Sequence, residues 1–280
     1  MALTNELAAK RAALDAELRS LGRTLVAYSG GTDSAFLAWA AYQALGADML
    51  AVIADSPSLA RFQLEDAIAF AREQQIPLEI IRTEELSRPE YIRNDASRCF
   101  HCKDELFSVM EHFAANNNFH SIAYGVNADD QGDFRPGQAA AAQHRIAAPL
   151  LNAGLRKGEI RELARDFRLR IWDKPASACL SSRIEYGRPV TSEALAAVEH
   201  GEDALRKLGF RQFRVRHHGE IARIEIAHDE MSRALTAEMA AEFARIFKQL
   251  GFKFVTLDLE GFRSGSMNSL LSPEQILRAS

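Results

Sequence analysis

Residues 29–34, with the sequence SGGTDS, have the composition of an anion-binding loop. Two adjacent glycines let the backbone approach an anion, and a helix that starts there offers unpaired N–H groups and a positive dipole end. The loop is not a Walker A motif, because no Gly-Lys-Ser/Thr follows at the required distance, and G-x-G-x-x-G is absent. We therefore predict a phosphate or pyrophosphate cradle. The alternative is a glycine-rich turn in which Asp33 or Ser34 only caps the helix.

Three cysteines are the second group of residues with chemical potential. Cys99 and Cys102 form a C-x-x-C pair, and Cys179 lies between two cations, Lys174 and Arg183, that favour its thiolate. Three thiolates suit an iron–sulfur cluster with one open iron, or zinc completed by a histidine or water. A redox dithiol and three unrelated thiols are alternatives that the spacing leaves open.

Polar residues follow two of the apolar runs. Asp129 and Asp130 could hold Mg²⁺ that bridges ATP phosphates, and Arg135 could neutralise an acidic substrate. Asp55 and Ser56 end another run, where nucleotides meet the carboxyl ends of parallel strands. For the segment that contains Asp129 and Asp130, an ordinary polar turn is the alternative.

Two arginines alternate along an expected strand nearer the C-terminus. Arg214 and Arg216 therefore share one face and could clamp a substrate phosphate, and Glu225 on the next strand could add a metal or polar contact. A solvated sheet face is the alternative explanation for these charges.

Strand-like and helix-like patterns alternate through the first part of the chain. This alternation predicts the α/β class with a doubly wound parallel sheet. The expected strands are 24–28, 49–54, 78–82 and 122–125, and the expected helices are 35–45, 59–75, 103–115 and 158–167.

Two adjacent strand patterns later break the alternation and predict a smaller α+β domain. The expected elements there are a helix at 192–208, strands at 213–217 and 221–227, a helix at 231–249 and a strand at 252–259. We place the boundary near residue 175, with one domain at 1–175 and the other at 176–280.

Composition excludes several classes of protein. The 280 residues are 47% hydrophobic and 26% charged, which suits a globular chain rather than a disordered one. A net charge of −4 and a pI near 6.1 lack the positive field of a nucleic-acid-binding protein, so no nucleic acid is expected. The sequence contains no apolar run of roughly 18 residues, the length that a membrane span needs, so no membrane span is expected. The odd number of cysteines suits a reducing compartment, so the expected location is the cytoplasm.

The motifs also carry a family resemblance. SGGTDS resembles the PP-loop of the ATP pyrophosphatase superfamily, whose members cleave ATP between the α and β phosphates to adenylylate an oxygen. From about Leu21 to Leu259, the chain is similar to the LarE family of ATP-dependent sulfur transferases. The shared blocks, in order, are SGGTDS, RCFHCK, YGVNADDQGDFRPG, KPASACLSSRIEYG and FRVRHHGEIARIEI.

The resemblance implies an enzyme that makes the nickel-pincer nucleotide, which is the cofactor of lactate racemase and related enzymes. ATP would activate each carboxylate of a pyridinium mononucleotide as an acyl-adenylate, and a sulfur nucleophile would displace AMP. One branch of the family sacrifices the sulfur of a cysteine matched by Cys179, which becomes dehydroalanine. A second branch, which this sequence matches better, holds a [4Fe-4S] cluster through three cysteines, here Cys99, Cys102 and Cys179.

The resemblance further implies roles for the residues named above. Cys179 and Asp33 are the expected catalytic residues, and ATP, Mg²⁺ and the cluster are the expected cofactors. The expected ATP-binding residues are Ser29, Gly30, Gly31, Thr32, Asp33, Ser34, Asp55, Ser56, Gly125, Asp129 and Asp130. The expected substrate-binding residues are Arg135, Ser182, Arg183, Arg214, Arg216 and Glu225. A homo-oligomer formed through the C-terminal domain and a sulfide donor are the implied partners.

Three rival functions make different predictions. A PP-loop tRNA thiolase with a three-cysteine cluster would carry a basic docking surface and often extra zinc-ribbon cysteines. An ammonia-using synthetase of the same superfamily would need no cysteines. A nucleotide-binding or metal-sensing module would hold ATP without releasing pyrophosphate.

Overall fold

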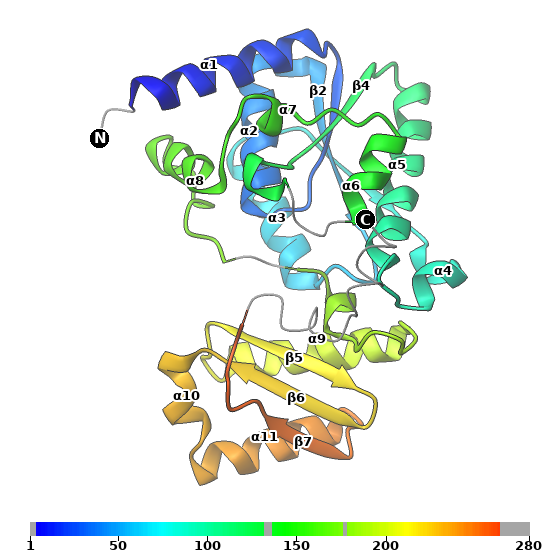
Figure 1. The fold of residues 1–280 in the computed structure, drawn as a ribbon, viewed down its shortest axis with the longest axis vertical. Helices are drawn as coiled ribbons and strands as arrows, with labels where there is room; N and C mark the ends of the chain where they lie inside the picture. Colours follow the sequence, from blue (N-terminus) through cyan, green and yellow to red (C-terminus); the bar gives the residue numbers. More distant parts are fainter. Residues whose placement is uncertain (1–3, 132–135, 176–177, 264–280) are drawn as a thin grey trace. The chain divides into compact units, whose positions relative to one another are not determined.

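The computed structural model describes residues 4–131, 136–175 and 178–263, which form two compact units (Figure 1). One unit comprises Met1–Glu84 and Cys99–Ser177, and the other comprises Glu85–Arg98 and Ala178–Ser280. The predicted fold class is confirmed, because the first unit is α/β with a parallel sheet and the second has a smaller sheet of its own. The segment Glu85–Arg98, expected in the first domain, groups with the second unit.

Four parallel strands form the sheet of the first unit, in the order β3-β2-β1-β4. The chain moves outward from β1 to β3 and then returns to the other side of β1, so the strand order reverses between β1 and β4. Ala27 at the end of β1 pairs with Val52 and Tyr124, which brings the carboxyl ends of three strands to one edge. Ligands of such sheets bind at this reversal point. The strands are β1 (Thr24–Ala27), β2 (Met49–Asp55), β3 (Leu78–Arg82) and β4 (Ser121–Tyr124).

Helices cover both faces of this sheet (Figure 1). One face packs against α1 (Asn5–Ser20), α2 (Thr32–Leu45), α3 (Arg61–Glu73), α7 (Pro149–Asn152) and α8 (Lys157–Asp166). The other face packs against α5 (Arg98–Asn116) and α6 (Pro136–Gln143). His144, just after α6, contacts Asp104 and Glu111 of α5 at 3.0 Å each and so ties these two helices together.

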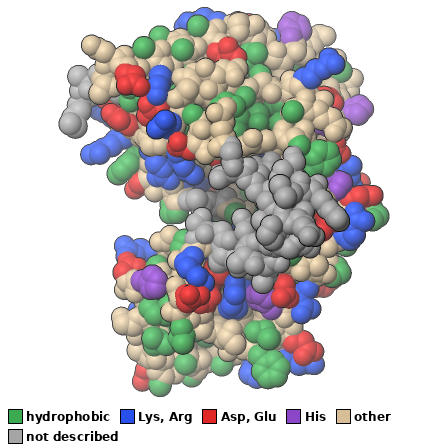
Figure 2. Space-filling model, viewed as in Figure 1, with side chains coloured by type: hydrophobic (Ala, Val, Ile, Leu, Met, Phe, Trp, Pro, Cys, Tyr) green, Lys and Arg blue, Asp and Glu red, His purple; other side chains and the backbone are tan. Residues whose placement is uncertain are grey.

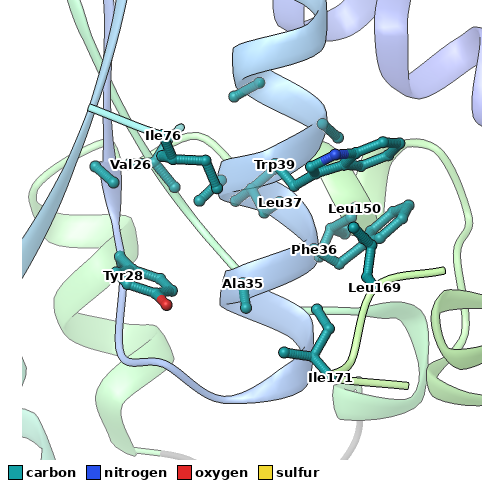
Figure 3. Packing of buried hydrophobic residues seen from close by; sticks show 14 of the residues in the cluster. Val26, Tyr28, Ala35, Phe36, Leu37, Trp39, Ile76, Leu150, Leu169 and Ile171 are labelled. Carbon is teal, nitrogen blue, oxygen red and sulfur yellow. The ribbon is translucent and has the colours of Figure 1, made fainter. Parts of the chain in front are cut away.

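Helix α2 lies at the centre of the larger core, and every residue from Ser34 to Ala41 is buried. A helix that is apolar on all sides must be enclosed by other elements. Figure 3 shows this enclosure, with Val26 and Ile76 on one side of α2 and, on the other, Leu150, Leu169 and Ile171 beside the helix's own Phe36 and Trp39. The helix that follows the SGGTDS loop therefore has a fixed position.

The second unit packs helices on one face of a three-stranded sheet of order β5-β6-β7. Strands β5 and β6 are antiparallel and β7 is parallel to β6. Its elements are η2 (Glu85–Ser87), α4 (Pro89–Ile92), η4 (Leu180–Arg183), α9 (Ser192–Lys207), β5 (Phe213–His218), β6 (Ile221–Ile226), α10 (His228–Ala234), α11 (Ala237–Gln249) and β7 (Phe254–Leu257).

Some element boundaries differ from those expected. Helix α2 begins at Thr32 rather than 35, so the second half of SGGTDS lies in its first turn, and α5 begins at Arg98 rather than 103, so the C-x-x-C pair lies at its start. The stretch expected as one helix at 231–249 forms two, because the Thr236 side chain accepts a hydrogen bond from the backbone N–H of Met239 and caps a new helix.

Charged side chains of both signs are interspersed over the face of the molecule in Figure 2. In the part of the chain that the structure describes, no helix has the length and apolar character needed to cross a membrane.

Candidate active site

The SGGTDS loop connects β1 to α2 at the point where the strand order reverses. Gly30 has a φ of +75°, and a Cβ placed on it would lie 2.6 Å from the Cβ of Ala67 on α3. Ser34 Oγ accepts a hydrogen bond from the Ser29 N–H at 3.1 Å and donates one to the Gly31 carbonyl at 3.2 Å. The loop thus closes tightly over the first turn of α2.

Replacing Gly30 with alanine is expected to destabilise the fold by about 2 kcal/mol or more, because a left-handed backbone and a steric clash act together. Urea unfolding measures this loss. Gly158 in α8 is the matched control, since a Cβ there meets nothing within 4 Å. Gly158→Ala should change the stability by less than about 1 kcal/mol, because alanine is favoured in helices. Equal losses in both variants would contradict the prediction.

The turn after β4 meets residues 29–34, the predicted phosphate loop, directly. A Cβ on Gly125 would lie 2.8 Å from the backbone nitrogen of Ser34, so only glycine allows this approach. Beyond it, the amide of Asn127 donates a hydrogen bond to Asp33 Oδ2 at 3.2 Å. The structure therefore brings together two of the predicted segments, 29–34 and 125–130. Asn127 was missed by the sequence analysis, although it lies within the acidic motif.

Asp33 occupies the first turn of α2 with one oxygen unsatisfied. Its Oδ1 is buried and has no hydrogen-bond partner among the described residues. Burial raises the pKa of this carboxyl, and the Asp130 charge raises it further, while Lys157, the amide of Asn127 and Arg161 oppose the rise. A buried carboxylate oxygen without a partner is costly unless a ligand satisfies it.

The two aspartates of the acidic motif have backbone partners. Asp130 Oδ2 accepts the N–H of Asn127 at 3.1 Å, and Asp129 Oδ2 accepts the N–H of Lys157 at 2.9 Å. They therefore shape the turn 127–130 and the start of α8. Arg135 lies outside the described residues.

The end of β2 adds a further polar group. Asp55 pairs with Arg61 at 2.5 Å, and the Arg61 guanidinium also donates to the carbonyls of Ser56 and Leu59. The hydroxyls of Ser56 and Ser58 lie 2.8 Å apart. The predicted residues Asp55 and Ser56 thus begin a hydrogen-bonded turn after β2.

A brace, formed by residues 171–174, supports the phosphate loop from outside. The Thr32 hydroxyl donates to the Ile171 carbonyl at 3.2 Å, and Lys174 Nζ donates to the Gly30 carbonyl at 2.8 Å and also pairs with Asp66. Arg161 on α8 holds the brace through the carbonyls of Trp172 and Lys174. Lys174, which we expected to favour the Cys179 thiolate, makes these contacts with the loop instead.

Cys99 and Cys102 lie one helical turn apart at the start of α5. Residues three apart share a helix face, so the C-x-x-C spacing presents both thiols to one side. Cys99, Cys102 and Cys179 are partly buried and form no disulfide. The first two belong to one unit and Cys179 to the other. Within the described part of either unit, no three His, Cys, Asp or Glu side chains are close enough to hold a metal ion.

Cys179 precedes the short helix η4, in surroundings that favour its thiolate. Its Sγ lies 3.1 Å from the hydroxyl of Ser181. Burial opposes ionisation, but the Arg98 charge, the Ser181 hydroxyl, the Ser182 N–H and the Arg183 charge together lower the pKa of the thiol. Arg183, which we expected beside this thiol, is thus one of the two cations that lower its pKa, and Arg98 is the other.

Arg98 and Asn94 hold the loop that follows Cys179. Arg98 is 3% exposed and donates to Asn94 Oδ1 at 2.5 Å and to the Ser181 carbonyl at 3.0 Å. The Asn94 amide donates to the carbonyls of Glu185 and Arg188 at 2.8 and 2.9 Å. Neither residue was singled out from the sequence, although Arg98 directly precedes Cys99.

Buried ion pairs surround this loop in the second unit. Arg183 Nε contacts Glu202 at 2.9 Å, and Arg216 Nη2 contacts Glu225 at 2.8 Å, with all four side chains less than one tenth exposed. Arg216 also donates to the Ser182 carbonyl at 3.2 Å. Glu225 is shared with Arg223, and Glu202 was missed by the sequence analysis.

Arg214 lies on the same sheet face as Arg216, as the strand alternation predicted. Burial, together with the like charges of Arg183 and Arg216, lowers the pKa of Arg214 to about 10. Such crowding of guanidinium groups makes an anion a favourable neighbour.

Comparison with known proteins decides the family. No family model matches the chain. It is 40% identical over 252 residues to an uncharacterized protein of Synechocystis, covering 90% of this chain and 94% of that one. It is 35% identical over 271 residues to the pyridinium-3,5-bisthiocarboxylic acid mononucleotide synthase of Lactiplantibacillus plantarum, covering 96% and 98%. The chain belongs to the LarE family.

The LarE relationship extends through both units, since the matched region spans nearly the whole chain. An uncharacterized protein of Methanocaldococcus jannaschii is also similar, at 29% identity over 242 residues, covering 86% of this chain and 91% of that one. The predicted membership in the LarE family is thus confirmed, and the roles of individual residues remain predictions.

Proposed function

We propose that this protein is an ATP-dependent sulfur transferase that converts the carboxylates of a pyridinium mononucleotide to thiocarboxylates, a step of nickel-pincer nucleotide biosynthesis. The observation that carries the proposal is 35% identity over 98% of a synthase named for the bisthiocarboxylic acid product. The phosphate loop and the cation-assisted Cys179 supply the two chemical functions that this reaction needs. We further propose that the enzyme acts as a homo-oligomer and receives its sulfur from a sulfide donor.

The first step activates the substrate. A carboxylate oxygen attacks the α phosphorus of ATP, and the bond to the β-phosphate oxygen breaks to release pyrophosphate. Residues 29–34 would hold that pyrophosphate through backbone N–H groups at the start of α2. Asp55 and Ser56, at the adjacent strand end, would border the nucleotide.

The residues present fit a magnesium ion at this loop. Asp33 offers a buried oxygen without a partner, and oxygen ligands are those that Mg²⁺ prefers. Asp33 would hold the ion, with Asp129 and Asp130 beside it. When bound, the ion would neutralise phosphate charge.

The second step transfers sulfur. A sulfur nucleophile attacks the carbonyl carbon of the adenylate, and AMP leaves with the electron pair of the broken bond. Cys179 is suited to a sulfur site because Arg98 and Arg183 favour its thiolate. Arg214 and its neighbours would bind the substrate phosphate.

Three thiols fit a [4Fe-4S] cluster by their chemistry, since thiolates are the ligands that such clusters require. Two of them lie one turn apart on α5, and Arg98, the residue before Cys99, bonds to the loop that follows Cys179. When bound, the cluster would offer one open iron for sulfide. Cys99, Cys102 and Cys179 would be its ligands.

Protein purified without oxygen tests the proposal. We expect about four iron atoms and four acid-labile sulfides per chain. With ATP, Mg²⁺ and the pyridinium biscarboxylate mononucleotide, mass spectrometry should detect thiocarboxylates, with one AMP and one pyrophosphate released per sulfur. Failure to release pyrophosphate with this substrate would overturn the proposed activity.

A further inference from the structure

The start of α8 is tied to the phosphate loop by one turn, residues 127–130. Asn127 donates to Asp33 at 3.2 Å, the Ala128 N–H donates to the Leu155 carbonyl at 2.8 Å, and Asp129 accepts the N–H of Lys157 at 2.9 Å. Lys157 is the first residue of α8, and it is therefore bonded to the same turn, 127–130, that is bonded to Asp33.

The ammonium group of Lys157 differs from the other cations here. Lys174 is engaged by the Gly30 carbonyl and Asp66, and Arg161 is engaged by two carbonyls of the brace. Lys157 is half-buried, yet its Nζ has no hydrogen bond or ion pair with any residue that the structure describes. A cation without a protein partner is available to an anionic ligand that can reach it.

Lys157 and Asp33 influence one another without direct contact. The Lys157 charge acts on the Asp33 carboxyl, and the Asp33 Oδ1 atom lacks a partner. An ammonium and a carboxylate that share a site without an ion pair both remain available to a ligand that carries an anion and a cation. A polyphosphate with a divalent cation has this chemistry.

We propose that Lys157 binds a β- or γ-phosphate oxygen of ATP and so stabilises the departing pyrophosphate. The inference rests on the proposed function and adds a residue that the sequence motifs do not include. As the bond between the α phosphorus and the bridging oxygen breaks, its electron pair passes to the pyrophosphate. The cation therefore meets more negative charge in the transition state than in bound ATP.

Calorimetric titration of the full chain with Mg²⁺-ATP, Mg²⁺-pyrophosphate and AMP tests the assignment. Lys157→Gln should weaken ATP and pyrophosphate binding at least tenfold and AMP binding less than twofold. Arg156→Gln is the matched control, because it removes the same charge from the adjacent exposed position and should change each affinity less than twofold. Lys157→Arg should recover most of the ATP affinity.

The possible outcomes separate the two proposals. Unchanged ATP affinity in Lys157→Gln, or equal weakening of ATP and AMP, would overturn the role of Lys157 and leave the function standing. A wild-type protein that binds none of the three ligands would overturn the nucleotide function, and the role of Lys157 with it. Thermal melting of each variant checks that the fold is retained.

Discussion

Cys179→Ala is expected to abolish thiocarboxylate formation while ATP cleavage continues. The thiol is the proposed sulfur site and belongs to the second unit, where Arg98 and Arg183 lower its pKa. The phosphate loop, which is proposed to bind the ATP that activates the carboxylate, belongs to the other unit and does not include this thiol. We expect the rate of sulfur transfer to fall by about 1,000-fold or more, as when a nucleophile is removed. Substrate-dependent exchange of pyrophosphate into ATP should stay within about threefold of wild type.

Cys99→Ala is the informative companion variant. If the three cysteines hold a cluster, both variants should lose iron and sulfur transfer together. If Cys179 donates its own sulfur, Cys99→Ala should still complete one turnover, and its Cys179 should lose about 34 Da as dehydroalanine forms. Full multiple-turnover activity in Cys179→Ala would contradict both mechanisms.

Asp33→Asn is expected to reduce pyrophosphate release by about 100-fold or more, because the carboxylate that is proposed to hold Mg²⁺ is lost. The same change should make the folded protein more stable at neutral pH. Burial raises the pKa of Asp33, so the folded state disfavours its charge. That cost is absent when the carboxyl is protonated and appears as the pH rises through its folded pKa. Asparagine avoids the cost.

Urea unfolding at several pH values checks this trade between stability and activity. The stability advantage of Asp33→Asn should shrink as the pH falls, because the wild-type carboxyl then becomes neutral as well. Asp48→Asn is the control, since Asp48 is exposed on a short turn and should change neither quantity. An Asp33→Asn protein with normal pyrophosphate release would remove Asp33 from the mechanism.

Local patterns were sufficient to predict the parallel sheet and the glycine-rich loop between its first strand and helix. Each strand of the first unit is a short apolar run. Glycine is required at position 30 because φ is positive there and a Cβ would clash with Ala67, and a Gly-Gly sequence is typical of such a turn. The start of α2 was placed too late because Thr, Asp and Ser resemble a loop. In the structure these residues fill the first helical turn, where polar and acidic side chains are favourable.

Partners that meet only through the tertiary structure could not be predicted. Lys174 is near Cys179 in sequence, but its ammonium contacts Gly30 and Asp66. Arg98 precedes the C-x-x-C motif, and nothing local links it to Ser181. The choice of partner for a long charged side chain depends on which buried acceptors the fold brings near it.

The excursion of Glu85–Arg98 into the second unit has a consequence for folding during synthesis. Asn94 and Arg98 leave the ribosome long before their acceptors, which lie 83 to 94 residues further along the chain. Until then the Asn94 amide and Arg98 lack the carbonyl acceptors of Ser181, Glu185 and Arg188, and burying such groups without those acceptors would cost about 1–3 kcal/mol each. The segment Glu85–Arg98 should therefore remain unpacked on the nascent chain until residues 178–263 fold. A truncated product would leave this segment unpacked, which quality control can recognise.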